Sequence, residues 1–412
     1  EKILEELKMS KKVIIVGAGP AGIMAALNAA KNNEVILIER NDEIGKKLKL
    51  TGGGRCNITN KRDIEEFFQR VVTNSKFLYS SFYNFTNENL LAYLDECNFK
   101  YKIESDNYNK VYTSTDKAED FIELLKNNLI KSKVKILYNK QVTDLIVEDG
   151  VIKGVVTNDN NKINGDKVIV TTGGKSFPVT GSDGSMFEIL SKYGHKINPL
   201  YPALVPLVIK EDFVKRLQGI SMKEVVFKTK IKKKNIEVTG DMIFTHFGLS
   251  GPGVLILSSY INKALENGEM EIRLDFLKNK SKEEISSIIR SNPNKTILNN
   301  MKGLLTQSFL KELIESLNLT ATKAAELKKV DENKLVEYIK EMRLTVRETL
   351  SIKAAQVTSG GVAVKEIDAS TMESKLIKGL YFAGEVIDVD AETGGFNLQI
   401  AFSTGTLAGS DY

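Results

Sequence analysis

Three glycines with the spacing Gly-x-Gly-x-x-Gly lie near the start of the chain, between an apolar run and a segment with helical character. Gly17 permits a tight turn, Gly19 lets the backbone approach a phosphate, and Gly22 lets a helix pack closely on a strand. The N-terminus of that helix presents unpaired N–H groups to an anion. Glu39 ends a second apolar run, where an acidic side chain can bind ribose hydroxyls. This pattern predicts a strand, turn and helix that bind a dinucleotide.

A second glycine-rich segment, Thr51-Gly52-Gly53-Gly54-Arg55-Cys56-Asn57, follows shortly afterwards. Consecutive glycines expose backbone N–H groups to an anion or a flat ring, and Arg55 and Asn57 add donors. A flexible linker usually carries serine or proline instead. We therefore expect a loop that contacts a cofactor. Three lysines precede this loop and either attract phosphate or are only solvated: Lys46, Lys47 and Lys49.

Near the other end of the chain, the apolar run 380–383 leads through a glycine to Glu385, whose carboxylate can accept hydrogen bonds from sugar-alcohol hydroxyls. Gly394-Gly395 then open a helix at about Asn397. The positive end of its dipole suits the pyrimidine edge of a flavin, where the reduced ring carries negative charge, and would raise the reduction potential. The alternative is a helix cap packed on a glycine turn. The two ends of the chain thus predict one flavin site.

Length and composition exclude several other classes of protein. The chain has 412 residues, 42% of them hydrophobic, which is enough core for two or three domains. The apolar runs are far shorter than the roughly 20 residues of a membrane span, and no secretory pattern opens the chain. We therefore expect a cytoplasmic protein that does not bind a membrane. Cys56 and Cys97 lie far apart and the two histidines do not cluster, so no metal site or disulfide is expected.

The net charge of +5 comes from scattered basic residues. The densest cluster, Lys232-Lys233-Lys234, is more typical of a solvated hairpin turn than of a nucleic-acid-binding patch. We therefore expect a small-molecule substrate and no nucleic acid.

Strand-like runs separated by turns fill residues 134–161 and predict a β-meander. The apolar run 167–171 then leads into Gly173-Gly174, beside which a ligand can lie. Further on, β-like runs are followed by lysine- and glutamate-rich helical periodicity over 282–342. We expect an α/β fold, in which a Rossmann-like FAD-binding domain with a β-meander is interrupted by an inserted β-rich and then helical domain. The expected boundaries are 1–195 and 346–412 for the FAD-binding domain and 196–345 for the insertion, which is β-rich to about residue 278.

The motifs resemble those of bacterial FAD-dependent oxidoreductases of the aminoacetone-oxidase or 3-dehydro-bile-acid-reductase type. The resemblance covers essentially the whole chain. The segments that carry it are Gly-Ala-Gly-Pro-Ala-Gly from Gly17, Thr-Gly-Gly-Gly-Arg-Cys-Asn-Ile-Thr-Asn from Thr51, Thr-His-Phe-Gly-Leu-Ser-Gly-Pro from Thr245, Thr-Ser-Gly-Gly-Val from Thr358, and Phe-Ala-Gly-Glu-Val-Ile-Asp-Val-Asp from Phe382 through Gly-Gly-Phe-Asn-Leu-Gln.

The resemblance implies a glutathione-reductase type of FAD fold with the inserted domain over the flavin. By that resemblance the ADP half would be held by Gly17, Gly19, Gly22 and Glu39. The remainder of FAD would be lined by Gly53, Gly54, Arg55, Val142, Gly173, Glu385, Asn397 and Leu398. Neighbouring positions that we also expect to bind the cofactor are Pro20, Ala21, Arg40, Thr172, Gly174, Gly384, Gly395 and Phe396.

A flavin enzyme needs an electron donor and an acceptor, and the cofactor supplies the electron chemistry. The sequence has no second strand, Gly-x-Gly-x-x-Gly and helix for a nicotinamide. If NAD(P)H is the transient donor, it must visit the same cleft as the second substrate, in ping-pong fashion. The sequence also lacks the Cys-x4-Cys pair of flavin disulfide reductases, which argues against thiol–disulfide transfer.

Three residues are candidates for catalysis. His246 could protonate a substrate carbonyl or enolate, since imidazole titrates near neutrality, although a lone histidine is often structural. Arg55 could stabilise an anionic flavin or a substrate carboxylate, or pair with a phosphate. Cys56 is either a redox thiol or a small packed side chain. His195 is expected in an ordinary surface loop.

The leading hypothesis is an FAD-dependent oxidoreductase that uses NAD(P)H to reduce an activated C=C bond, such as that of a small enone. The first alternative is an FAD-dependent oxidase of a small amine, with oxygen as the acceptor. The second is a flavin-containing protein that binds a partner or RNA. Lysine and glutamate interleave over residues 282–340 instead of forming a basic face, which weakens the second alternative.

Overall fold

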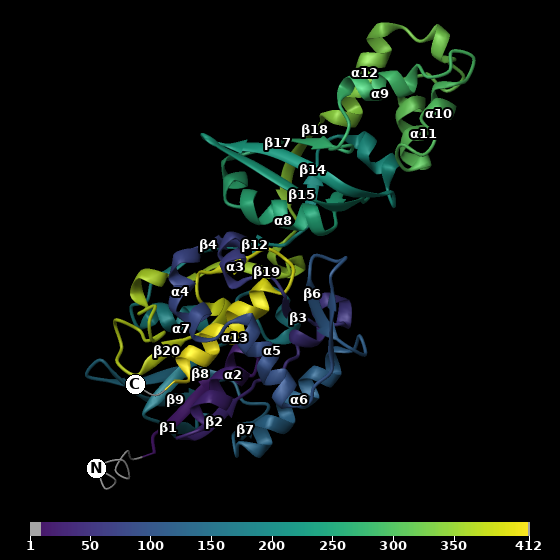
Figure 1. Ribbon diagram of the computed structural model, residues 1–412. Helices are drawn as coiled ribbons and strands as arrows, with labels where there is room; N and C mark the ends of the chain where they lie inside the picture. The colour runs from purple at the N-terminus through teal and green to yellow at the C-terminus, as the bar shows by residue number, and fades with distance from the viewer. Residues whose placement is uncertain (1–9, 411–412) are drawn as a thin grey trace. The chain divides into compact units, whose positions relative to one another are not determined.

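The protein is described here by a computed structural model, which covers residues 10–410 and divides into two compact units (Figure 1). Unit 1 comprises residues 10–201 and 356–410, and unit 2 is the intervening segment Pro202–Ala355. The expected boundary at 345/346 falls inside strand β18 (Met342–Thr349), which pairs with two other strands of unit 2. Each unit has its own hydrophobic core.

A five-stranded sheet in the order β20-β11-β1-β2-β7 is the centre of unit 1. Its strands are β1 (Lys12–Val16), β2 (Glu34–Ile38), β7 (Lys135–Leu137), β11 (Lys167–Val170) and β20 (Leu380–Phe382). Every neighbouring pair is parallel. The carboxyl ends of all five strands therefore lie at one edge, which is where open α/β sheets bind ligands. The runs are continuously apolar because both faces are covered.

Two helices from opposite ends of the chain pack together on this sheet. Helix α2 (Pro20–Ala29) follows β1, and α13 (Phe396–Ala408) ends the described chain. A Cβ atom on Gly405 would lie 2.2 Å from the Ala21 carbonyl oxygen, so the two backbones approach more closely than a larger residue would allow. The C-terminal segment is thus an integral part of the predicted nucleotide-binding fold.

The predicted β-meander is present as an antiparallel sheet in the order β10-β9-β8. Its strands are β8 (Val142–Glu148), β9 (Val151–Thr157) and β10 (Lys162–Asn164). The first of the predicted runs, 134–138, instead contributes β7 to the parallel sheet. Hydrophobic periodicity could not distinguish a strand of the meander from a strand of the parallel sheet, because each needs a short apolar strand.

Unit 1 contains further helices and short strands. The helices are α3 (Ile64–Arg70), α4 (Tyr79–Asn84), α5 (Asn87–Glu96), α6 (Ala118–Lys131) and α7 (Ser185–Lys192). The strands are β3 (Asn57–Asn60), β4 (Val71–Thr73), β5 (Tyr101–Glu104), β6 (Lys110–Thr113), β12 (Ile197–Ala203), β19 (Val357–Val362) and β21 (Asp390–Ala391). Strands β12 and β19 pair with each other where the chain leaves for unit 2 and returns from it.

Unit 2 is a closed six-stranded barrel with a helical part, as the β-rich and then helical sequence predicts. The barrel order is β13-β16-β15-β14-β17-β18. Its strands before β18 are β13 (Leu207–Ile209), β14 (Ser221–Ile231), β15 (Lys234–Phe244), β16 (Gly248–Ser250) and β17 (Met270–Asp275). The helices are α8 (Pro252–Ile261), α9 (Lys282–Ile289), α10 (Ile297–Asn300), α11 (Gln307–Ser316) and α12 (Lys329–Lys340). The predicted hairpin turn at Lys232-Lys233 joins β14 to β15 and is confirmed.

The structure corrects the placement of His195, which we expected in an ordinary surface loop. Its side chain is buried, its Nε2 lies 2.8 Å from the Ser374 hydroxyl, and its ring meets the edge of Phe382. Burial lowers the pKa of the His195 imidazole. The neutral ring is therefore the form that the folded protein prefers.

The burial of His195 predicts a pH-dependent stability. Because the folded pKa is lowered, an unfolded chain whose histidine has an ordinary pKa of about 6.5 takes up the proton first, and stability falls as the pH drops below that value. Chemical unfolding measures the free energy of unfolding, which should fall in the wild type between about pH 7 and pH 5. His195→Gln should remove part of that fall. The control His246→Gln alters an exposed ring and should keep the wild-type dependence. If the free energy of unfolding changes with pH equally in both variants, the prediction is wrong.

Candidate cofactor site

The predicted glycine turn lies at the carboxyl edge of the sheet, between β1 and α2. A Cβ atom on Gly22 would lie 1.9 Å from the Gly17 carbonyl oxygen and 2.5 Å from the Thr171 hydroxyl, so no side chain fits there. Gly19 is different, since apart from its chain neighbours no heavy atom of the described residues lies within 4 Å of its would-be Cβ. The turn is therefore closed on the protein side and open where a ligand would lie.

The N-terminus of α2 is available to an anion. Gly19 is its N-cap, Pro20 occupies the first turn, and no acidic residue stands there. Within residues 10–410 no side chain caps this end. The unpaired N–H groups of the first turn and the helix dipole therefore favour a negatively charged group.

Glu39 follows β2 and lies beside the turn, as predicted. Its buried carboxylate accepts hydrogen bonds from the Ala18 N–H at Oε2 and from the Asn41 N–H and amide at Oε1, each 2.8 Å long. A carboxylate has about four acceptor positions, so one remains on Oε2 for a ribose hydroxyl.

Two other predicted cofactor residues lie close to Glu39. Arg40 forms a 2.6 Å ion pair with Asp183 and contacts the Gly181 carbonyl, so its guanidinium already has a protein partner. Val142 begins β8, and the nearby Lys140 N–H donates to the Glu39 carbonyl.

The second glycine segment forms a loop over Leu48–Gly54 with three successive left-handed residues: φ is 59° at Gly52, 68° at Gly53 and 89° at Gly54. Apart from chain neighbours, no described heavy atom lies within 4 Å of a Cβ placed on Gly53 or Gly54. Glycine is therefore needed for the conformation, while the space beside the loop is open. This is what close approach of a ligand requires.

Strand β3 connects this loop to the N-terminus of α13. The Asn57 amide donates to the Val111 and Thr59 carbonyls and accepts from the Gly395 N–H at 2.9 Å. The Asn60 amide donates to the Gly394 carbonyl at 3.1 Å. Strand β3, which follows the glycine loop, is thus directly hydrogen-bonded to the start of α13, although the two are far apart in sequence.

At the N-terminus of α13, the backbone N–H groups are the predicted cofactor contacts, and the Asn397 side chain is engaged within the protein. That amide accepts from the Ala391 N–H at 2.9 Å and donates to the Ala391 and Glu392 carbonyls. It therefore holds the preceding segment in place. Gly395 is the N-cap and, within the described chain, no side chain caps the helix, so the N–H groups of Phe396 and Leu398 stay in the uncapped first turn.

Glu385 follows β20 and a left-handed Gly384, at the same edge of the sheet. Its Oε1 accepts from the Thr358 N–H at 2.7 Å and from the Ser176 hydroxyl at 3.1 Å, and its Oε2 accepts from Lys47 Nζ at 2.9 Å. Ser176, Thr358 and Lys47 were not among the predicted site residues. The sequence features that pointed to Lys47 and Thr358 are the lysine cluster before the glycine loop and the Thr-Ser-Gly-Gly-Val segment.

Gly173 and Gly174 lie directly beside this carboxylate. A Cβ on Gly174 would lie 3.2 Å from Glu385 Oε1, and one on Gly173 would lie 3.9 Å from Oε2. The adjacent Thr172 hydroxyl is a buried oxygen atom without a hydrogen-bond partner among residues 10–410. An orphaned hydroxyl at this edge fits the binding of a polar ligand.

The structure argues against the catalytic roles predicted for Arg55 and Cys56. The Arg55 guanidinium pairs with Glu104 and, at 2.7 Å, with Asp116, and it covers the Tyr112 ring at 4.0 Å. These carboxylates raise its pKa further, and its charge is committed to the protein. The Cys56 thiol is buried, and burial raises its pKa to about 12. A protonated, inaccessible thiol is a poor nucleophile.

His246, the third predicted catalytic residue, is exposed in the turn between β15 and β16 of unit 2. Its ring meets the edge of Phe247. Helix α8 follows shortly after this turn and begins at Pro252. His246 is accessible to a substrate, and its role stays a prediction.

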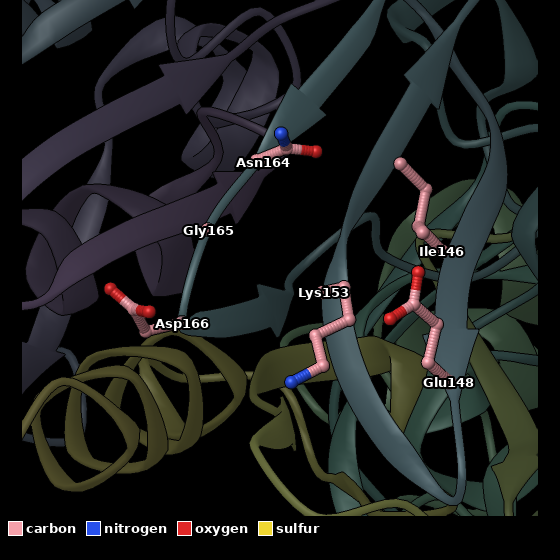
Figure 2. Close-up of a pocket in the computed structure, with 6 residues that line it drawn as sticks. All are labelled: Ile146, Glu148, Lys153, Asn164, Gly165 and Asp166. Atoms are coloured by element: carbon pink, nitrogen blue, oxygen red, sulfur yellow. The ribbon is translucent and has the colours of Figure 1, made fainter.

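A pocket of about 340 Å³ lies elsewhere in unit 1, lined by Ile146, Glu148, Lys153, Asn164, Gly165 and Asp166 (Figure 2). Asp166 precedes β11, so this pocket is at the amino edge of the sheet, opposite to the glycine turn. It is therefore separate from the candidate cofactor site.

No helix in residues 10–410 combines the length and apolar character that a bilayer crossing needs. The same residues contain no group of three His, Cys, Asp or Glu side chains suited to a metal ion.

The residues present fit FAD. The uncapped α2, the spare acceptor on Glu39, the open glycine loop and the orphaned Thr172 hydroxyl provide for an anion, a ribose and a polar chain along one sheet edge. The fold and this site define the class of the protein, an FAD-dependent oxidoreductase. More particularly, the chain belongs to the family described as HI0933-like protein Rossmann domain, whose profile matches residues 11–411.

Two characterised relatives span nearly the whole chain. The 3-dehydro-bile acid Δ(4,6)-reductase of Clostridium scindens is 33% identical over 97% of this chain and 98% of its own length. A ribosomal RNA dihydrouridine synthase of Haemophilus influenzae is 30% identical over 95% of this chain and 96% of its own.

Among solved structures, the chain is similar to the 3-ketosteroid-Δ4-(5α)-dehydrogenase of Rhodococcus jostii, with a TM-score of 0.50, 13% identity and 99% coverage of both chains. A flavocytochrome c3 fumarate reductase gives a TM-score of 0.51 at 15% identity, over 99% of this chain and 78% of that one. At these identities the likeness shows the fold, and the predicted Rossmann-like architecture is confirmed.

Glu39→Gln should weaken nucleotide binding, because an amide cannot accept from every donor around it and still bind a ribose hydroxyl. We expect the affinities for FAD and for ADP to fall at least about tenfold, or about 1.4 kcal/mol, in fluorescence and calorimetric titrations of the apoprotein. Glu43→Gln is the matched control, because Glu43 is exposed and pairs only loosely with Lys49 at 3.9 Å. Unchanged ADP affinity in Glu39→Gln would refute its ribose role.

Proposed function

We propose that the protein reduces a C=C bond conjugated to a carbonyl group in a small molecule, with NAD(P)H as the electron donor. The observation that carries this proposal is the 33% identity, over 97% of the chain, to a bile acid reductase. That relative's name specifies reduction of ring double bonds, which is the reaction that the enone hypothesis requires.

One structural feature supports a ping-pong order. Within residues 10–410 there is a single parallel sheet of the nucleotide-binding type, and its glycine turn is assigned to FAD. NAD(P)H would therefore have to reach the flavin by the same cleft as the acceptor and leave before the acceptor binds. When bound, FAD would supply the hydride chemistry of both half-reactions through its N5 atom.

The protein must supply a proton as well as a place for the acceptor. Hydride adds to the carbon β to the carbonyl and a proton adds to the α carbon, so each turnover consumes one NAD(P)H and one proton. Of the two histidines in the sequence, His195 is buried and neutral whereas His246 is exposed. We therefore keep His246 as the proposed proton donor or carbonyl-polarising residue.

Anaerobic rapid mixing tests this proposal. The visible absorbance of the oxidised flavin should bleach on mixing with NADH or NADPH and return when a cyclic enone is added. A flavin that is bleached by a small amine and reoxidised only by oxygen, with peroxide formed and no NAD(P)H consumed, would instead identify the oxidase alternative.

His246→Gln separates the two half-reactions. The variant should slow reoxidation by the enone by about 100-fold, in the range of general acid catalysis, while leaving flavin reduction by NAD(P)H near the wild-type rate. The two rates are measured separately in the same rapid-mixing experiment. Equal losses in both half-reactions would point to a packing role.

A second candidate is reduction of uracil bases in RNA. The C5=C6 bond of uracil is conjugated to a carbonyl, so the same hydride and proton transfer would produce dihydrouridine. The H. influenzae relative is an RNA dihydrouridine synthase. In addition, the tip of the β14–β15 hairpin carries a cluster of exposed lysines. Among the described residues, these have no ion-pair partner: Lys230, Lys232, Lys233 and Lys234.

This hairpin tip weakens the expectation that nucleic acid is excluded, because clustered unpaired lysines suit a phosphate backbone. The two candidates differ in a direct measurement. Dihydrouridine formed in RNA by the enzyme and NAD(P)H, without turnover of free enones, would identify the RNA candidate and reject the small-molecule proposal.

A further inference from the structure

Lys47 joins three segments at the carboxyl edge of the sheet. It immediately precedes the glycine loop, and its Nζ donates to Glu385 Oε2 at 2.9 Å and to the Ser176 hydroxyl at 2.7 Å. Ser176 is buried and in turn donates to Glu385 Oε1 at 3.1 Å. Lysine, serine and glutamate therefore form a closed ring of hydrogen bonds.

The numbers of donors and acceptors show what this ring leaves unused. Glu385 has about four acceptor positions, and two on Oε1 and one on Oε2 are taken by protein donors. The Lys47 ammonium has three N–H donors, and two are used within the described residues. One acceptor on Glu385 and one donor on Lys47 therefore remain, on adjacent atoms.

These spare positions are accessible. The side chains of Lys47 and Glu385 keep 23% and 21% of their exposure, and a Gly173 Cβ would lie 3.9 Å from Oε2. Since position 173 is glycine, nothing larger than hydrogen covers the carboxylate from that residue. A hydroxyl group matches the vacant pair, because it donates to Glu385 and accepts from Lys47 at the same time.

We propose that Lys47 binds the cofactor: together with Glu385 it holds a ribityl hydroxyl of FAD, the lysine as donor and the glutamate as acceptor. The proposal rests on FAD as the cofactor of the proposed function. The ADP half is assigned to the glycine turn and Glu39, so the effect of Lys47 belongs to the other half of the molecule.

Lys49 does not share this arrangement. Its Nζ lies 3.9 Å from Glu43 and 3.8 Å from Glu119, and both glutamates are exposed. Lys49→Met therefore removes the same charge two residues away without touching the ring of hydrogen bonds, and it serves as the matched control.

The test is a titration of full-length apoprotein with FAD and with ADP. Lys47→Met should raise the dissociation constant for FAD at least tenfold and leave that for ADP within twofold of wild type. Lys49→Met should change neither. In a Lys47→Met/Glu385→Gln double variant, the loss of FAD affinity should be smaller than the sum of the two single losses in free energy, because the residues act as a pair.

Three results would overturn the proposal: unchanged FAD affinity in Lys47→Met, equal weakening of FAD and ADP, or additive losses in the double variant. Equal weakening would mean that Lys47 only maintains the sheet edge. These results are independent of the substrate. A wild-type protein that binds FAD but reduces no enone rejects the proposed function and leaves the Lys47 result intact, whereas a wild-type protein that binds no FAD overturns both.

Discussion

The contact between the start of α2 and the end of β11 is the constraint on which unit 1 depends. Gly22 lies so close to the Gly17 carbonyl and the Thr171 hydroxyl that even a methyl group would displace the helix. This contact sets the N-terminus of α2 at the carboxyl edge of the sheet. An anion-binding helix end is useful only if it is held there, and a glycine is the residue that allows it.

The parallel arrangement of the sheet explains how distant segments form one site. Glu39, Gly173 and Glu385 each follow a different strand, and parallel strands end at a common edge. The glycine loop reaches the same region through two connections, Lys47 to Glu385 and Asn57 to Gly395. The site is therefore a property of the topology, and no single segment contains it.

The features that could be predicted from the sequence are those in which the signal is local. The glycine turn needs only a strand before it and a helix after it, and Glu39 needs only the next strand. The meander and the β-rich character of the insertion likewise follow from short apolar runs separated by turns. The closure of the insertion into a barrel and the assignment of 134–138 to the parallel sheet depend on strand pairing that periodicity does not encode.

The rest depends on partners far along the chain. From the sequence alone, Arg55 is expected to bind an anion. In the structure, its positive charge is neutralised by Glu104 and Asp116, which come from a distant part of the chain. His195 is buried because of Phe382 and Ser374, almost half the chain away. Among three neighbouring lysines, only the backbone path of the loop decides that Lys47 meets Glu385.

The division of unit 1 has a consequence for biosynthesis. Strand β20 and helix α13 come from the last part of the chain, whereas unit 2 is one continuous segment. On the ribosome, the barrel can complete its hydrogen bonds while the parallel sheet still lacks an edge strand and α2 lacks its helical neighbour. Unit 1 therefore exposes apolar surface until β20 and α13 have emerged, and such exposed surface is what chaperones bind.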